Sequence, residues 1–263
     1  MAMRALSSAA SGMQAHEFIT EVISNNLANI STTGFKRSNV AFQDLLYQNE
    51  KRVGTNPAGD VIIPTGIQVG LGVKTGAIYR IHEQGEFKQT SSDWDLAIKG
   101  DGYFIVNLPD GSTAYTRAGN FTLSPSGEIV TIDGYTVQPG ISIPQDTIDV
   151  TISEEGVVST LAPQTIQWAI QGTIQIANFV NEVGLVAAGK NLYAETEASG
   201  APVITNPGEA NSGTLLQGWL ENSNVNPITE ITNLITAQRG YEMGSKVIQA
   251  VDEMMQTINN SKR

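Results

Sequence analysis

The stretch that decides the fold is NVNPITEITNLITAQRGYEMGSKVIQAVDEMMQTI, residues 224–258. Apolar or small residues recur along it at alternating steps of three and four. This alternation keeps one stripe of a helix facing a partner, as in a coiled coil. Asn226 is suited to cap the helix and Pro227 to its first turn, where a missing N–H costs nothing. The members of the stripe are Leu234, Ala237, Tyr241, Gly244, Ile248, Val251, Met255 and Ile258.

The opposite end of the chain carries the same pattern. Residues 3–31 are predicted to form a second amphipathic helix, with Gly34 as a stop just beyond it. Its outward face is mostly Ser, Asn, Gln and Thr, so we expect much of its circumference to lie against protein, although an ordinary core helix is the alternative. Its stripe consists of Leu6, Ala9, Met13, His16, Thr20, Ile23, Leu27 and Ile30.

The middle of the chain has the pattern of a β-rich domain. From 78 to about 203, short apolar runs alternate with turns that contain Gly, Pro or Asp, which favours antiparallel strands. Runs at 96–98 and 103–106 flank residues 99–102, which are predicted to form a hairpin turn. The expected fold class is α+β: an antiparallel coiled coil of the terminal helices, an extended β-arm and an antiparallel β-rich outer domain.

Between the first helix and the β region lies a polar, glycine-rich segment, residues 49–76. A connection of this length is unusual unless it has a task, and we predict an extended arm with strands at 61–63 and 67–69. The expected domains are a coiled-coil core (1–33 and 224–263), a connecting arm (34–90 and 200–223) and a β-rich outer domain (91–199). Residues that define the arm are Gly54, Pro57, Pro64, Gly66, Gly70 and Gly72.

Composition excludes several classes of protein. The chain has 263 residues, no cysteine and a net charge of −11, with a pI near 4.6. This charge argues against a nucleic-acid partner, which requires a basic face. The absence of cysteine excludes disulfides and thiolate metal sites. We expect no membrane insertion, because no long apolar run is present, and no secretory signal, because the N-terminus lacks a basic start and a continuous apolar core.

The sequence offers little support for catalysis. The chain has two histidines. His16 lies on the helix stripe, where the one possible ligand at helical spacing is Thr20, a poor ligand, and His82 lies in a polar run. Most of its Asp and Glu residues in the β region lie in turns, where Asp is favoured for backbone reasons. We therefore predict no enzyme, no metal and no cofactor. A sugar-stacking face is an alternative, although packing in a core is the favoured interpretation of its members Trp94, Trp168, Trp219, Tyr103, Tyr115 and Tyr135.

Three separated motifs resemble bacterial flagellar rod and hook proteins. The segment 24–37, SNNLANISTTGFKR, is similar to the N-terminal signature of that family. The segments 220–226 and 238–242 are similar to its C-terminal signature, and 95–104 and 115–121 to its outer-domain segments. The signature residues are Asn25, Asn26, Leu27, Ala28, Asn29, Thr32, Gly34, Phe35, Lys36, Arg37, Asn222, Ser223, Asn224, Val225, Arg239 and Tyr241.

This resemblance implies a structural subunit of the flagellar basal body, with the distal rod as the nearest match in length and arm. Such subunits polymerise into a rigid hollow shaft that transmits torque to the hook and contains the export channel, with the arm stiffening it. The implied partners are further copies, proximal rod proteins, hook protein and ring proteins. The implied location is the periplasm-spanning basal body, reached without a cleavable signal peptide. The alternatives are a proximal rod protein and a secreted carbohydrate-binding or adhesive module.

Overall fold

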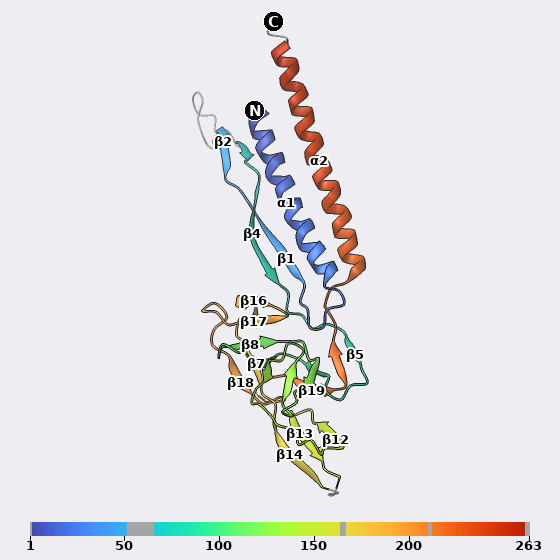
Figure 1. The fold of residues 1–263 in the computed structure, drawn as a ribbon. Coiled ribbons are helices and arrows are strands. Elements are labelled where there is room, and N and C mark those ends of the chain that lie inside the picture. Colours follow the sequence, from blue (N-terminus) through green and yellow to red (C-terminus); the bar gives the residue numbers. More distant parts are fainter. Residues whose placement is uncertain (1, 52–65, 164–166, 210–211, 261–263) are drawn as a thin grey trace. The chain divides into compact units, whose positions relative to one another are not determined.

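The structure, a computed structural model, describes residues 2–51, 66–163, 167–209 and 212–260 (Figure 1). The chain divides into two compact units. The helical unit comprises residues 1–27, 38–79 and 226–263. The β unit comprises residues 28–37 and 80–225.

Both terminal helices form where the apolar periodicity predicts them. Helix α1 spans Ala2–Ala28 and helix α2 spans Pro227–Asn260. The Asn226 side-chain oxygen accepts the N–H groups of Ile228 at 3.0 Å and Thr229 at 3.3 Å. These bonds satisfy two of the donors that every helix leaves open at its start, so the predicted cap is confirmed. Of the helices that the structure describes, neither is long and apolar enough to cross a membrane.

Helix α1 ends at Ala28, earlier than the predicted residue 31. A turn follows it, in which Thr32 donates its N–H to the Asn29 carbonyl at 3.1 Å and its hydroxyl to Asn29 Oδ1 at 3.2 Å. Gly34 then adopts a left-handed backbone with φ of 68°, the conformation expected after a helix end. Ile30, which was predicted to extend the helix stripe, therefore lies outside α1 and belongs to the β unit.

Four strands of the helical unit form a ribbon. Strand β1 (Ser38–Asp44) pairs with β4 (Val73–Arg80), and β2 (Tyr47–Lys51) pairs with β3 (Ile67–Gly70). The Leu45 N–H donates to the Gly72 carbonyl at 2.9 Å, which joins the two pairs. Ser11 of α1 accepts the N–H of Val73 at 3.3 Å and ties the ribbon to the helix. The strand expected at 67–69 is confirmed, and the strand expected at 61–63 lies outside the described residues.

A nine-stranded sheet dominates the β unit. Seven of its strands follow the order β16-β17-β8-β7-β11-β10-β9, and β15 joins β7 to β18. Their bounds are β7 Tyr103–Asn107, β8 Thr113–Thr116, β9 Phe121–Leu123, β10 Ile129–Thr131, β11 Thr136–Val137, β15 Ile176–Asn178, β16 Val186–Gly189, β17 Leu192–Ala194 and β18 Val203–Thr205.

Three smaller sheets and a short 3-10 helix at Glu182–Gly184 complete the β unit. One sheet has the order β12-β13-β14, and the other two consist of the pairs β6–β19 and β5–β20. Their bounds are β5 Phe87–Gln89, β6 Leu96–Lys99, β12 Asp149–Ile152, β13 Val157–Leu161, β14 Trp168–Thr173, β19 Thr214–Gln217 and β20 Trp219–Glu221.

Strand β7 lies between two apolar clusters. Phe104 and Val106 belong to the larger one, and Tyr103 and Ile105 to the smaller one, because successive side chains of a strand point to opposite faces. Tyr115 joins Tyr103 in the smaller cluster, so these two aromatic residues pack a core. The six aromatic residues considered for a sugar-stacking face therefore do not form one exposed surface.

The hairpin predicted around residues 99–102 is wrong. Strand β6 pairs with β19, so that Ile98 lies opposite Leu215, whereas β7 pairs with β8, β11 and β15. The Gly213 N–H donates to the Asp101 carbonyl at 2.7 Å, which places the chain before β19 beside this turn. A distant strand thus takes the position that a local hairpin partner was expected to occupy.

Candidate assembly interface

Helices α1 and α2 pack in antiparallel directions, and two glycines of α2 allow their close approach (Figure 1). The His16 ring lies against Gly240 and the Met13 side chain against Gly244, so closely that a Cβ at either glycine would overlap its neighbour. Towards the end of α1, Asn26 contacts Glu230 near the start of α2. Small residues at such positions are what permit two helix backbones to approach each other.

Asn26 is a buried polar residue of the helical unit, and its side chain is only 1% exposed. Its Nδ2 donates to the Ser38 carbonyl at 2.9 Å and to Glu230 Oε2 at 3.4 Å, and its Oδ1 accepts the Ser38 N–H at 2.9 Å. One amide therefore joins the end of α1, the start of β1 and the first turn of α2. Glu230 is buried too, at a helix N-terminus, where the helix dipole stabilises a carboxylate.

Some of the predicted seam residues are buried or partly buried, and others are exposed. Tyr241, Met255 and Ile258 are 48%, 45% and 60% exposed. At Tyr241, the residue that faces α1 is instead Gly240, one position earlier. The helix register places Ala2 opposite about residue 254, so Met255 and Ile258 lie past the described start of α1. Ile23 and Val251 are buried, and those partly buried are Leu6, Met13, Thr20, Leu27, Ile30, Leu234 and Ile248. Their role in assembly stays a prediction.

Helix α2 carries apolar side chains on its outer side as well. Large side chains there leave at least 45% of their area exposed. Soluble proteins rarely leave a run of large apolar residues open unless it binds something. This outer stripe, as we call it, consists of Ile228, Ile231, Ile235, Met243, Val247 and Met254.

A buried ionic cluster lies in the β unit and unites the N-terminal, outer-domain and C-terminal motifs. Lys36 Nζ lies 2.6 Å from Glu221 Oε1, and Arg117 Nη1 lies 3.5 Å from Glu221 Oε2. The three side chains are only 1–2% exposed. Glu221 Oε1 also accepts the Gly85 N–H at 2.9 Å, and Lys36 Nζ donates to the Glu83 carbonyl at 2.8 Å.

Glu221 is thus the one carboxylate in contact with both buried cations, and the partly buried Glu182 adds a more distant negative charge. Burial lowers the pKa of Lys36, against the attraction of Glu221, which raises it. Burial also lowers the pKa of His82 to about 4, helped by the positive charges of Lys36, Arg117 and Arg80. Neutral His82 is held by its Nδ1, which lies 2.7 Å from the Tyr103 hydroxyl.

Further signature residues connect the two segments of the chain through which the backbone enters and leaves the β unit. Asn224 Oδ1 accepts the Arg37 N–H at 2.7 Å, and its Nδ2 donates to the carbonyls of Ile81 at 2.8 Å and Glu83 at 3.1 Å. Phe35 is buried beneath the Arg80 guanidinium, 5.8 Å from its ring centre. Val225 and Gly34 are also buried, Asn29, Thr32, Arg37 and Ser223 are partly buried, and Asn25, Ala28, Asn222 and Arg239 are exposed.

Only part of the predicted arm falls in the described residues. Gly54, Pro57 and Pro64 lie outside them, Gly66 precedes β3, and Gly70 ends β3. Gly72 has a φ of 121°, and Ser11 lies where its Cβ would stand, so this position requires glycine.

Arg117, Glu221 and Glu230 are buried charges that were not predicted from the sequence. Glu221 lies within a recognised motif, but no local pattern indicates that a carboxylate will be enclosed. The pair Gly240 and Gly244, four residues apart, is the one signal that predicts close helix packing, and it favours Gly240 over Tyr241 as a seam position.

Comparison with known proteins agrees with this arrangement of motifs. Residues 6–36 match the family described as flagella basal body rod protein, 97–160 the flagellar hook protein FlgE/F/G D1 domain, and 216–261 the flagellar basal body rod FlgEFG protein C-terminal region. The chain is 56% identical to the flagellar basal-body rod protein FlgG of Caulobacter vibrioides over 98% of both chains. It is 48% identical to that of Agrobacterium fabrum, over 98% of this chain and 99% of the relative. It is 45% identical to that of Borreliella burgdorferi, over 99% of each.

Proposed function

The chain belongs to the flagellar basal-body rod protein family, and from this membership we propose that it is a structural subunit of the distal rod. The observation that carries the proposal is the similarity to proteins named FlgG over 98–99% of the chain. Its role in the cell is mechanical: copies polymerise into a rigid hollow shaft that transmits torque and encloses the export channel.

The outer stripe supports polymerisation. Helix α2 already uses one side to pack on α1, and the side that carries Ile231, Ile235, Met243 and Val247 is left exposed in the single chain. Covering it requires other subunits, because burial of apolar side chains is favourable at about 25 cal/mol per Å². Heterologous contacts that do not close into a ring generate a filament, and we infer this mode of packing for the rod.

Assembly of the purified full-length chain, viewed by electron microscopy, tests the proposal. Val247→Glu places a charge in the outer stripe and should abolish straight tubes, whereas Gln249→Glu, at an exposed polar position of the same helix, should leave them intact. Leu27→Asp and Ile248→Asp in the predicted seam should also prevent assembly while the β unit stays folded. Full-length rods from either seam variant would contradict the seam, and tubes from Val247→Glu would contradict the role of the stripe.

The same proposal extends to partners and location. We propose that the rod continues into proximal rod proteins and hook protein, passes through ring proteins in the periplasm, and is built from chains exported without a cleavable signal. We propose that it needs no cofactor and catalyses no reaction, since its part is structural. Labelling of isolated basal bodies with an antibody to this chain should mark the rod segment next to the hook, and a label elsewhere would contradict the placement.

The ribbon supports the predicted stiffening arm, which is also part of the proposal. Residues 38–51 and 67–80 pair along their length and are tied to α1 at Ser11. A paired ribbon resists bending more than single strands do, because its ladder of hydrogen bonds constrains both chains. Deletion of residues 47–70, which removes β2 and β3, should therefore leave assembly possible but give curved or flexible tubes.

A further inference from the structure

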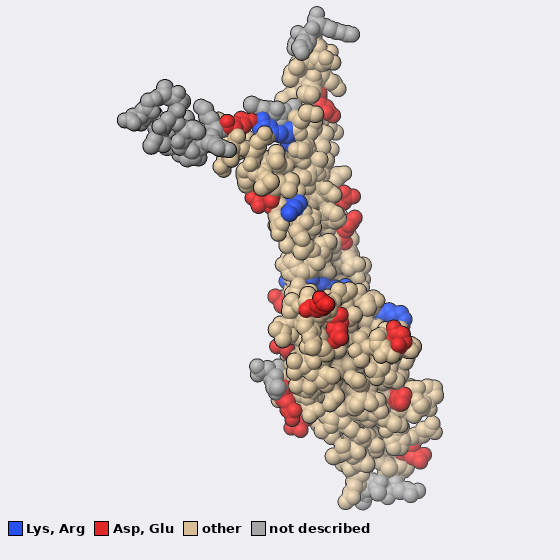
Figure 2. Space-filling model, turned by 90° about the vertical axis from the view of Figure 1, so that its left-hand side faces the viewer, with Lys and Arg blue, Asp and Glu red and all other residues tan. Residues whose placement is uncertain are grey.

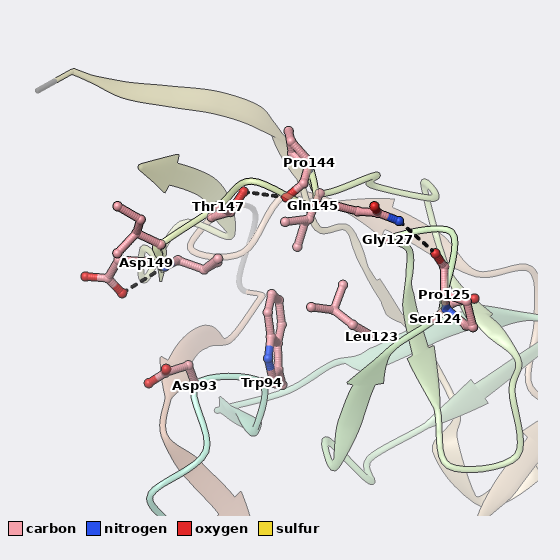
Figure 3. A pocket seen from close by; sticks show the side chains of 13 residues that line it. Asp93, Trp94, Leu123, Ser124, Pro125, Gly127, Pro144, Gln145, Thr147 and Asp149 are labelled. Atoms are coloured by element: carbon pink, nitrogen blue, oxygen red, sulfur yellow. Dashed lines mark hydrogen bonds between the residues drawn. The ribbon is translucent and has the colours of Figure 1, made fainter. Parts of the chain in front are cut away.

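The β unit contains a hollow of about 430 Å³ beside Trp94 (Figure 3). The Trp94 indole stands in it with Leu123 on one side and Asp93 and Asp149 on the other, and the two carboxylates point away from the ring. Ile148, which is also exposed, adds to its lining. We call this hollow the Trp94 pocket.

Hydrogen bonds hold the walls of the Trp94 pocket in place. Gln217 Nε2 donates to the Asp93 carbonyl at 3.0 Å and to the Val150 carbonyl at 2.9 Å, so one amide fixes the two segments that carry the carboxylates. On the far wall, Gln145 Nε2 donates to the Pro125 carbonyl at 3.4 Å. The pocket is therefore formed before any ligand arrives, which lowers the entropy cost of binding.

The surroundings of the pocket are strongly acidic. Residues 118–225 contain eleven Asp or Glu residues and a single basic residue, Lys190, whereas the rest of the chain is nearly balanced, with fifteen acidic and fourteen basic residues. Figure 2 shows carboxylates spread over the β unit with few Lys or Arg side chains among them. Among the described residues that line the pocket, none is Lys, Arg or His. A negative field of this kind attracts cations to the site.

We propose that the Trp94 pocket binds an arginine or lysine side chain carried by an extended segment of a different protein. The aliphatic stem of that side chain packs on the face of the Trp94 indole that is opposite Leu123. Its cationic head extends past the ring to Asp93 and Asp149, which form charge-assisted hydrogen bonds with it. A second copy of this chain is a poorer occupant, because its β unit carries seventeen acidic residues and seven basic ones and would bring a net negative charge against the same negative surface. The inference does not depend on the rod function proposed above.

A peptide titration tests the chemistry of the pocket. Full-length protein labelled with 5-fluorotryptophan gives signals for Trp94, Trp168 and Trp219, which Trp→Phe variants assign. The Trp94 signal should shift saturably with acetyl-Gly-Pro-Arg-Pro-Gly-amide and not with the same peptide carrying neutral citrulline. Equal shifts with both peptides, or a shift with a chito-oligosaccharide instead, would overturn the proposal.

Variants that remove the same charge at different places distinguish binding by the two pocket carboxylates from attraction by the negative charge of the whole β unit. Asp93→Asn/Asp149→Asn should weaken peptide binding by about ten- to a hundredfold, the range for loss of a charge-assisted hydrogen bond. The Asn introduced at 149 keeps an oxygen for the Val150 N–H, which Asp149 accepts at 2.8 Å, so the fold is preserved. Glu154→Gln/Glu155→Gln removes the same charge outside the pocket and should change binding by no more than about twofold. Equal weakening by both pairs would refute a specific site.

A photo-cross-linker identifies the occupant in the source bacterium. Placed at Leu123, it should yield an adduct with another protein, in which a Lys or Arg lies within a few residues of the linked position. That adduct should disappear with Asp93→Asn/Asp149→Asn and persist with Glu154→Gln/Glu155→Gln. An adduct with a second copy of this chain alone, or one indifferent to the aspartates, would overturn the assignment.

Discussion

Replacing Glu221 by Gln is expected to destabilise the β unit far more than replacing Lys36 by Met. Gln retains an oxygen for the Gly85 N–H, but it removes the negative charge. Lys36 and Arg117, both almost fully buried, then lose the carboxylate that contacts them and keep only the more distant charge of Glu182. Leaving buried charges uncompensated costs about 3–5 kcal/mol.

The Lys36→Met variant should be milder because each remaining group keeps a partner. Glu221 retains Arg117 at 3.5 Å and the Gly85 N–H. The Glu83 carbonyl loses the Lys36 ammonium but still accepts the Asn224 amide at 3.1 Å. Methionine fills most of the space of the lysine stem, so we expect a loss of about 1 kcal/mol, the net worth of one hydrogen bond.

Urea unfolding of the full-length chain measures both effects. The three tryptophans all lie in the β unit, so their fluorescence reports on this unit. Lys88→Met, on the exposed face of β5, is the matched control and should stay within about 0.5 kcal/mol of the unsubstituted protein. If Lys36→Met costs as much as Glu221→Gln, the view that one carboxylate compensates two cations is wrong.

Three other outcomes follow from the contacts described above. Gly244→Val should weaken the helix pair by about 1–3 kcal/mol, because its side chain overlaps Met13, and Met13→Ala should partly restore the helical content measured by circular dichroism. Asn26→Ala leaves the buried Glu230 carboxylate without that donor and should cost about 1–3 kcal/mol in thermal unfolding, whereas Asn26→Asp should be worse because it sets two carboxylates together. The pKa of His82 is lowered from about 6.5 to about 4, so between these pH values the unfolded chain binds a proton that the folded chain does not. The contribution of His82 to the free energy of unfolding should therefore be constant above about pH 6.5 and fall by up to about 3 kcal/mol toward pH 4. A plot of this free energy against pH that slopes in the parent and is flat in His82→Gln would confirm the shift.

Much of the helical unit was predictable because its signals are local. The steps of three and four between Leu234 and Val251 specify α2, and Asn226 marks its start. At Tyr241 the predicted stripe and the contact with α1 differ by one position: a heptad pattern favours the larger side chain, whereas the residue that packs on His16 is Gly240. Helix α1 ends early where a turn begins at Asn29, whose carbonyl accepts the Thr32 N–H three residues on and whose side chain accepts the Thr32 hydroxyl.

The β unit was predictable as a class and not as a pairing. Short runs with turn residues specify strands, but the partner of β6 is β19, more than a hundred residues away, rather than its neighbour β7. The candidate site divides in the same way. Asn26 and Lys36 were recognised through their motifs. Their partner Glu230 lies outside the motifs, and Glu221 lies inside one, but no local pattern predicts the burial of either carboxylate.

Alternation and composition are properties of neighbouring residues, so the chain alone settles that it has two long terminal helices around a β-rich middle and that it carries rod-family motifs. The enclosure of Glu221 between Lys36 and Arg117, the register of α1 on Gly240 and Gly244, and the hollow at Trp94 arise only on folding. Lys36 and Glu221 are separated by 185 positions, and only long-range packing removes water from both and makes their charges depend on each other.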